Sequence, residues 1–362
     1  MNRILRSVML AGVMALGGTA GAIGPQTVQP VDGETDLGFF YSLGDSGTPF
    51  NKRKFVTMRE PQFEVAKNTV LDEDEQVIGL TDGGTEWCFP IRLMTYHHIA
   101  RVPNQPGNLV VTYCAMANSA VAFRPYASWG NGTKYGMDLQ VAGSYSGTLV
   151  VSRNFTYIYN SPTAEAYFPQ INPAAPIPDV SPRQPMDIGP PLSITTYGLW
   201  RRKFPETLVL QPVPKFADKY AEYDAKPKGY SILKERDRTI KMQDKRLSPG
   251  REVYGVAMGQ ESSAWSIEEV EHRKQIFVPM GGEVVHIVWD QELKTPVVVN
   301  PPEGIIATRC YWYSWSSFYP GGPLNGKFAV PGEVVALPKP QAEPAVETTT
   351  VTASQITGRA EK

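Results

Sequence analysis

Cysteine is scarce in this chain of 362 residues, which contains only three: Cys88, Cys114 and Cys310. Three cysteines are too few to act as the disulfide scaffold of a chain this long. The odd number allows either one disulfide with one free thiol or three buried thiols. The length and the 42% of hydrophobic residues instead predict a globular protein with an ample core, in one large domain or two ordinary ones.

An excess of one charge is also lacking. The chain carries 35 Lys and Arg against 36 Asp and Glu, and they are scattered along it. This balance gives no electrostatic footprint for nucleic acid or for an anionic membrane surface. The glycine pairs at 83–84, 281–282 and 321–322 lack the Lys-Ser/Thr of a phosphate-binding loop, so they predict turns.

Long hydrophobic runs are absent after the N-terminus, and no segment reaches 18 uninterrupted apolar residues, which predicts no membrane span. At the N-terminus, Arg3 and Arg6 precede an apolar stretch at 7–18, and Ala-Gly-Ala follows it at 20–22. This order is typical of a signal peptide, so we expect residues 1–22 to be removed and the soluble mature chain to be periplasmic or secreted. No cysteine follows the stretch, which argues against a lipid anchor.

Proline and glycine are abundant, at 32 each, together with 17 Tyr and 7 Trp, and this composition favours many short strands and turns. We therefore expect a mainly β protein with a few short helices, with an α+β fold as the alternative. The predicted divisions are an extended arm at 23–75, a first β-rich lobe at 76–160, a proline-rich strap with a helical or loop connection at 161–246, a second β-rich lobe at 247–337 and a disordered tail at 338–362.

Two β-rich stretches resemble each other at a constant spacing. Val-Ile-Gly-Leu at 77–80 aligns with Val-Tyr-Gly-Val at 253–256, an offset of 176 residues. The same offset then pairs glycines, prolines and apolar residues as far as Pro125 and Pro301, while polar positions drift. This pattern predicts an internal duplication, two lobes built alike and a cleft between them. Chance similarity between two hairpin-rich stretches is the alternative.

An ordered series of short motifs resembles a known family. Residues 111–117 read Val-Thr-Tyr-Cys-Ala-Met-Ala and are followed by Ser-Ala-Val-Ala-Phe at 119–123. They resemble the secreted prokaryotic family catalogued as domain of unknown function 3179, which typically reads Val-Thr-Tyr-Cys-Pro-Leu-Cys at this point. Matching segments run in order from about 77 to 320, at 96–99, 195–200, 205–210, 244–247 and 311–320. The resemblance implies a fold, a secreted setting and a site near the cysteine and histidine, but no reaction.

The chain departs from the family pattern at two positions of that site. Ala117 stands where the family has its second cysteine, and His98 stands where the family has a glutamate after its histidine. A Cys-x-x-Cys pair acts as a redox couple or metal clamp because both sulfurs reach one point. With Ala117, a redox role of Cys114 would need Cys88 or Cys310 as its partner.

The residues His97, His98, Cys114 and Met116 form the richest candidate metal site. Imidazole, thiolate and thioether groups together suit copper, which an exported protein would meet. The same residues also fit core packing, because methionine and cysteine fill gaps and a histidine hydrogen-bonds a turn. A second hypothesis makes Cys114 a nucleophile with His97 as its base, although nothing nearby identifies an oxyanion hole.

The aromatic run at 311–319 could stack sugars or other flat ligands, or it could pack in the core. Read as a strand it presents Tyr311, Tyr313 and Trp315 on one face, and read as a helix it presents Trp312, Trp315 and Tyr319. The leading functional hypothesis is an exported binding protein for a ligand such as copper. The alternatives are a cysteine-dependent enzyme and a structural partner that has lost the family's site, so the small ligand or protein partner stays unknown.

Overall fold

The computed structural model describes residues 55–103, 109–128, 134–136, 139–145, 148–154, 165–174, 186–225 and 242–336. The predicted signal peptide, most of the predicted arm and the predicted tail lie outside these ranges. Within them the chain is mainly β, and its five α-helices are each seven or eight residues long. No helix in this part of the chain has the length and apolar character that crossing a bilayer requires. The expectation of a mainly β fold with a few short helices is therefore confirmed.

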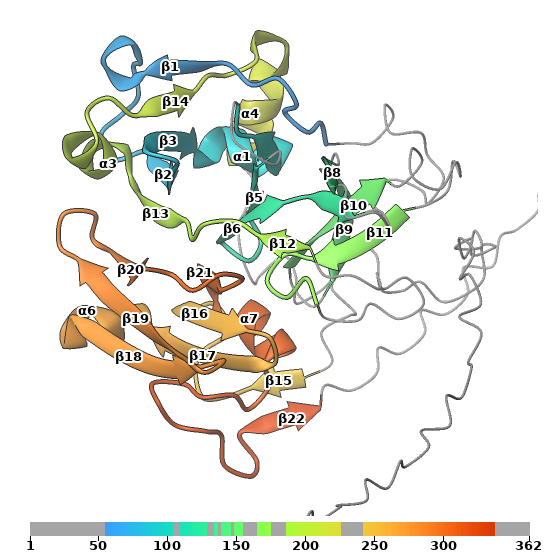
Figure 1. The fold of residues 1–362 in the computed structure, drawn as a ribbon, viewed down its shortest axis with the longest axis vertical. Helices are drawn as coiled ribbons and strands as arrows, with labels where there is room; N and C mark the ends of the chain where they lie inside the picture. Colours follow the sequence, from blue (N-terminus) through green and yellow to red (C-terminus); the bar gives the residue numbers. More distant parts are fainter. Residues whose placement is uncertain are drawn as a thin grey trace, which may run out of the picture.

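The first lobe contains the described elements up to residue 225, in the upper half and at the right of Figure 1. Its two main sheets have the strand orders β1-β14-β3-β2-β13 and β12-β6-β5-β4, and a third sheet has the order β11-β10-β9. Its elements are β1 (Phe63–Val65), β2 (Gln76–Asp82), β3 (Thr85–Pro90), α1 (Ile91–His97), β4 (Ile99–Arg101), β5 (Val110–Cys114), β6 (Ser119–Arg124), β7 (Tyr126–Ser128), β8 (Lys134–Gly136), β9 (Leu139–Tyr145), β10 (Thr148–Asn154), β11 (Glu165–Pro169), β12 (Asp187–Ile188), β13 (Ser193–Thr196), α3 (Tyr197–Lys203), β14 (Leu208–Leu210) and α4 (Ala217–Asp224).

The second lobe occupies the lower half of Figure 1. Its sheets have the orders β17-β16-β21, β18-β19-β20 and β15-β22. Its elements are β15 (Met242–Asp244), β16 (Glu252–Met258), β17 (Glu261–Ser266), α6 (Ile267–Arg273), β18 (Gln275–Met280), β19 (Glu283–Asp290), β20 (Thr295–Val299), β21 (Ile306–Tyr311), α7 (Trp312–Phe318) and β22 (Val334–Ala336).

Turn chemistry in the sequence sets the first hairpin of each lobe. Gly83 and Gly84 join β2 to β3 with φ of 59° and 77°. Two consecutive residues in the left-handed region give the tight turn whose twist matches the twist of paired strands, and glycine adopts it without strain. After each hairpin a helix of seven residues follows at once, and a left-handed residue ends it: His98 after α1 and Lys274 after α6.

The bounds of the elements repeat between the lobes at the offset seen in the sequence. The first strand, second strand and helix begin at 76, 85 and 91 in the first lobe and at 252, 261 and 267 in the second. A closing strand and helix complete each lobe: β13 and α3 pack on β2, and β21 and α7 pack on β16. These correspondences fit two lobes built alike, while the duplication itself is a statement about origin and stays a prediction.

The stretch expected to be a strap does more than connect the lobes. Two of its strands enter the first lobe's sheet, because β13 pairs with β2 and β14 pairs with β3. A further strand, β12, pairs with β6. The prolines thus leave room for short ladders between them.

One hydrophobic cluster also joins the lobes, since it contains Cys114 and Val121 from the first lobe and Val253 and Trp315 from the second.

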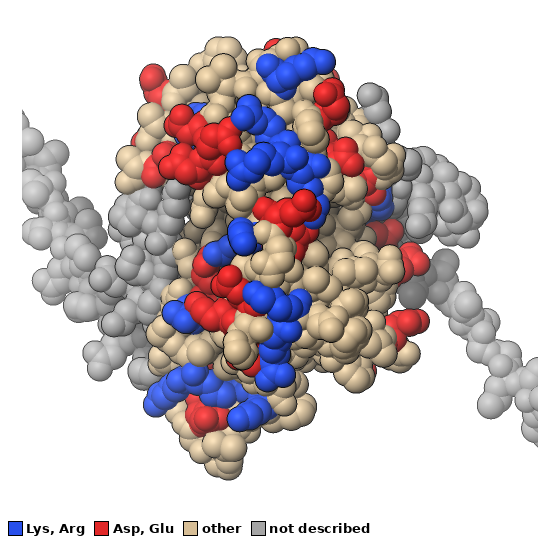
Figure 2. Space-filling view, turned by 90° about the vertical axis from the view of Figure 1, so that its left-hand side faces the viewer, with Lys and Arg blue, Asp and Glu red and all other residues tan. Residues whose placement is uncertain are grey.

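The charged side chains are mixed on the face of the molecule shown in Figure 2. Acidic and basic residues alternate from its top to its bottom, without an extended area of one sign. Ion pairs between described residues include Arg201 with Glu73 and Lys203 with Glu292. The mixture of signs on this face agrees with the near-equal numbers of acidic and basic residues in the sequence.

Candidate functional site

His97 lies at the end of α1 with both ring nitrogens already used. Its Nδ1 lies 2.5 Å from the Val56 carbonyl oxygen, and its Nε2 lies 2.8 Å from the Tyr220 hydroxyl. Because a carbonyl only accepts, Nδ1–H donates to Val56 and Nε2 accepts from Tyr220. Burial lowers the pKa of His97 to about 4. The ring is therefore neutral at pH 7 and ties the arm at residue 56 to α4.

His98 points to a different place from His97. Its left-handed backbone ends α1, and its Nδ1 donates to the Tyr113 carbonyl oxygen over 2.9 Å. Burial lowers the pKa of His98 to about 4 as well. Each histidine therefore hydrogen-bonds to a backbone carbonyl through its neutral ring, and this role is structural.

Cys114 ends β5, and its side chain lies on the face of the sheet opposite to Tyr113. Alternate residues of a strand face opposite ways, and Tyr113 and Cys114 accordingly belong to separate hydrophobic clusters. Met116 packs partly buried against the cluster of Cys114, and the Ala117 N–H donates to the Cys114 Sγ over 3.4 Å. His97 packs instead on Tyr96, Phe216 and Tyr220.

The described residues contain no group of three or more His, Cys, Asp or Glu side chains arranged to hold a metal ion. A copper site made by His97, His98, Cys114 and Met116 would require two rearrangements. The Tyr220 hydroxyl would have to leave His97, and side chains that now pack in different clusters would have to approach one another. The copper site stays a prediction. The third thiol, Cys88, lies in yet another cluster, and burial raises the pKa of both the Cys88 and the Cys310 thiols.

The turn that carries the family motif is anchored on the second lobe. The Tyr311 N–H donates to the Ala117 carbonyl over 2.8 Å, and the Tyr313 hydroxyl donates to the Met116 carbonyl over 2.5 Å. The Asn118 amide donates to Glu252 over 2.6 Å, and Glu252 is also paired with Arg309. The motif therefore forms a lobe–lobe joint in this chain.

The two neutral histidines predict a loss of stability in acid. Their folded-state pKa of about 4 lies below the ordinary value of 6.5, so between these values the unfolded chain binds protons that the folded chain does not. Stability should be unaffected by these groups above pH 6.5 and fall as the pH drops toward 4, at about 1.4 kcal/mol per pH unit for each histidine. Urea unfolding from pH 7.5 to 4.5 measures this slope.

The variant His97→Gln should reduce that slope by about half of the two-histidine contribution, because glutamine keeps a donor and an acceptor but does not titrate. His272→Gln is the matched control, since His272 is exposed at the end of α6. An identical slope in the wild type and in His97→Gln would contradict the assignment of His97 as a buried neutral imidazole.

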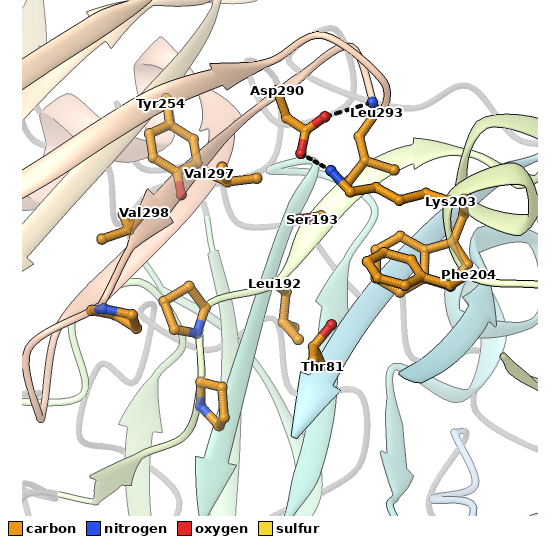
Figure 3. A pocket seen from close by; sticks show the side chains of 15 residues that line it. Thr81, Leu192, Ser193, Lys203, Phe204, Tyr254, Asp290, Leu293, Val297 and Val298 are labelled. Carbon is orange, nitrogen blue, oxygen red and sulfur yellow. Dashed lines mark hydrogen bonds and ion pairs between the residues drawn. The ribbon is translucent and has the colours of Figure 1, made fainter. Parts of the chain in front are cut away.

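A cleft of about 270 Å³ lies between the lobes (Figure 3). The first lobe contributes residues of β2, β13 and α3 and of the segment between β12 and β13, and the second contributes β16, the end of β19, the following turn and β20. The side chains labelled in Figure 3 are Thr81, Leu192, Ser193, Lys203, Phe204, Tyr254, Asp290, Leu293, Val297 and Val298. Small-molecule sites are concave, mostly apolar and often placed between domains, and this cleft has all three properties.

Tyr254 supplies an unusual polar group to the cleft. The side chain is 1% exposed, and its hydroxyl has no hydrogen-bond partner among the described residues. In Figure 3 the ring extends from β16 and its hydroxyl end points into the pocket. Burial raises the pKa of Tyr254, so the hydroxyl stays protonated and able to donate. A buried hydroxyl without a partner costs about 1–3 kcal/mol, which makes it an exception that calls for an explanation.

An ion pair between the lobes closes one side of the cleft. The Lys203 ammonium of α3 pairs with the Asp290 carboxylate of β19, and a second carboxylate, Glu292, lies 3.1 Å from the same ammonium. The other Asp290 oxygen accepts the backbone N–H groups of Glu292 and Leu293, each over 2.9 Å. Figure 3 shows the contacts to Lys203 and Leu293 as dashed lines. The pair is thus satisfied from within the protein.

The turn of the second lobe that lines the cleft corresponds, in the internal repeat, to the turn of the first lobe that carries the family motif. At the 176-residue offset, Asp290 corresponds to Cys114, and the turns that follow both contain a left-handed residue, Asn118 and Lys294. Sequence reasoning missed Tyr254, Lys203 and Asp290. The repeat pairs Asp290 with Cys114 of the family motif and could have pointed to Asp290, whereas no local pattern marks Lys203 or Tyr254.

A second, wider groove of about 670 Å³ lies on the second lobe, between β17, β18 and residues 318–328. The aromatic run contributes Phe318 and Tyr319 to it, while its α7 helix buries Trp312 and Trp315. The helical reading of this run is therefore the correct one. None of the described side chains that line the groove is a buried polar group without a partner. We take the cleft between the lobes as the candidate functional site for that reason.

Comparison with known proteins identifies the family but adds no activity. The family described as "Protein of unknown function (DUF3179)" matches residues 56–305, which cover the described elements from β1 to β20. No curated protein and no solved structure matches the chain. The match covers more than half of the chain and includes the motif turn and the elements that build the cleft. The chain therefore belongs to the DUF3179 family of proteins of unknown function.

Proposed function

We propose that this protein is an exported binding protein that holds one small organic molecule in the cleft between its lobes. The observation that carries the proposal is the hydroxyl of Tyr254, which is buried in the cleft without a partner. A ligand atom that pairs with this hydroxyl would remove the cost of leaving it unsatisfied. Folding alone gives no reason to keep a polar atom there, because phenylalanine has the same ring and no such cost.

The composition of the cleft supports the same reading. Leu192, Val297 and Val298 give apolar surface to the cleft, and Thr81 and Ser193 add hydroxyl groups. Binding sites for small molecules combine apolar walls with a few polar groups that fix the orientation of the ligand. The cleft needs both lobes, so the inter-lobe contacts of β13 with β20 and of β21 with β6 serve to form it.

A cysteine-dependent reaction has less support. An active thiol needs an exposed setting that favours the thiolate, and all three cysteines are buried. For Cys88 and Cys310, burial raises the pKa and so disfavours the thiolate. Cys114 contributes to the shared core of the lobes through its apolar neighbours. We therefore assign the motif turn to holding the lobes together and the cleft to binding.

The proposal is tested by the compounds that accompany the protein when it is purified from the compartment to which it is exported. Val298→Trp should fill the cleft, whereas Val299→Trp on the same strand is the matched control, because Val299 is 39% exposed and does not line the cleft. Mass spectrometry of the released small molecules should find the same compound with the wild type and Val299→Trp and at least tenfold less with Val298→Trp. Equal amounts in all three proteins would contradict the proposal.

The same samples test the two remaining expectations. A mature chain that begins at Ile23 in the intact mass would support removal of the predicted signal peptide, and a chain that keeps residues 1–22 would contradict export by that route. The second expectation is the copper site. It would be supported by about one copper per chain in the wild type that is lost in a Cys114→Ala, His97→Ala double variant. The absence of metal after loading under reducing conditions would exclude it.

A further inference from the structure

The chemistry of the cleft restricts what it can bind, and this inference rests on the proposed function. The first restriction concerns charge. Lys203 and Asp290 line the cleft and pair with each other, and the exposed Glu292, which does not line the cleft, pairs with the same ammonium. The carboxylate of Asp290 is held by Lys203 and by two backbone N–H groups. Lys203 is the one cation among the described lining residues and is already paired, so an anionic ligand would leave water without a new partner, and a cationic one would have to displace Lys203 from Asp290.

The second restriction concerns hydrogen bonding. The Tyr254 hydroxyl is the one described polar group in the cleft that is buried and lacks a partner. As a protonated phenol it donates best to an oxygen acceptor, such as a carbonyl or a hydroxyl. A wholly apolar ligand would leave the hydroxyl unpaired and would gain nothing from it. The ligand therefore needs one oxygen at the end that enters the cleft.

The third restriction concerns size and shape. A volume of about 270 Å³ is just below the ~300–1,000 Å³ of sites for drug-sized ligands, so it suits a compound of one ring. The walls present flat or compact apolar surfaces from Pro190, Pro191, Pro301 and Val298, with Phe204 nearby. Such surfaces pack well against the faces of a ring.

We infer that the cleft binds a small, uncharged ring compound that carries one carbonyl or hydroxyl oxygen, which accepts a hydrogen bond from Tyr254. Three probes of similar size separate the restrictions: phenol has the ring and the oxygen, toluene has the ring alone, and benzoate adds a negative charge. Their dissociation constants can be measured by ligand-observed NMR titration of the full mature protein.

The wild type should bind phenol more tightly than toluene, and benzoate most weakly. Tyr254→Phe should weaken phenol binding about three- to tenfold, the range expected for one neutral hydrogen bond, and leave toluene binding unchanged. Val298→Trp should weaken the binding of phenol and toluene alike, and Val299→Trp should change neither. Thermal unfolding of each variant checks that it is folded, and Tyr254→Phe keeps the ring that packs in the core.

The outcomes separate this inference from the proposed function. If Tyr254→Phe binds phenol as the wild type does, or if benzoate binds best, the assigned ligand class is wrong, while the loss caused by Val298→Trp would still support a ligand site in the cleft. If Val298→Trp leaves the affinity for every probe unchanged, the cleft does not bind them and both the inference and the proposed function fail.

Discussion

Replacement of Arg246 by methionine should destabilise the protein by about 3–5 kcal/mol, the cost of leaving one partner of a buried ion pair without the other. The Asp244 side chain is fully buried and that of Arg246 is 7% exposed. The guanidinium donates to both carboxylate oxygens of Asp244 and to the carbonyls of Gly322 and Lys327. Methionine fills a similar space but removes the cation that pairs with Asp244, which keeps only the backbone N–H groups of Arg246 and Gly321, and it removes the guanidinium donor of the Gly322 carbonyl.

The pair lies in the segment at 244–247, one of those that resemble the family. The Arg246 side chain holds the loop after α7 through the carbonyls of Gly322 and Lys327. The Asp244 carbonyl also accepts a hydrogen bond from the indole N–H of Trp312 over 2.9 Å. Arg251→Met is the matched control, because Arg251 is half exposed and its pair with Glu268 is worth at most about 1 kcal/mol. Urea unfolding measures both. A loss below 1 kcal/mol for Arg246→Met would show that the buried pair does not stabilise the second lobe.

Removal of Trp315 should cost about 3–5 kcal/mol, because the indole is 1% exposed and lies directly over Gly255 of β16. A Cβ added at Gly255 would lie 2.3 Å from the indole carbons, so Gly255→Ala should cost about 1–3 kcal/mol through overpacking. The first lobe repeats the arrangement, since a Cβ at Gly79 would lie 2.1 Å from Trp200. Removal of Trp200 and Gly79→Ala should therefore also destabilise the protein.

A double variant tests whether the contact itself is the cause. Once Trp315 is alanine, the additional methyl at Gly255 meets no indole, so Gly255→Ala with Trp315→Ala should cost less than the sum of the single losses. Gly250→Ala serves as the control, because no heavy atom lies within 4 Å of the Cβ it would add. Additive losses in the double variant would mean that Gly255 is required for another reason.

Several elements could be predicted from the sequence because they depend on neighbouring residues. The turn at Gly83 and Gly84 and the helix that follows it require only local backbone preferences and one hydrophobic pattern. The aromatic run at 311–319 could not be assigned in this way, because its aromatic residues fit either a strand or a helix. Its packing decides the question: as α7 it buries Trp312 and Trp315 in the core shared by the lobes.

The internal repeat predicted a cleft between the lobes, but the residues that line it were beyond prediction for a related reason. His97 and Cys114 are close in the family motif series, yet the direction of each side chain depends on what packs around it. His97 lies at the end of α1, where its ring hydrogen-bonds to Tyr220 of α4. Because side chains alternate along β5, Cys114 packs in the hydrophobic cluster on the face opposite to Tyr113. The cleft joins residues as distant as Thr81 and Val298. No spacing in the sequence encodes that approach.

The sequence by itself determined the β-rich class, the family and the constant offset between the two lobes, because composition, turn residues and short-range patterns depend on local chemistry. Only the tertiary structure decided how the lobes meet. Their contact sets the motif turn of Cys114 against β21 and opens the cleft at Asp290, and it leaves the hydroxyl of Tyr254 inside without a partner. Burial and hydrogen-bond satisfaction are properties of the assembled core, so they arise only when segments far apart in the chain are brought together.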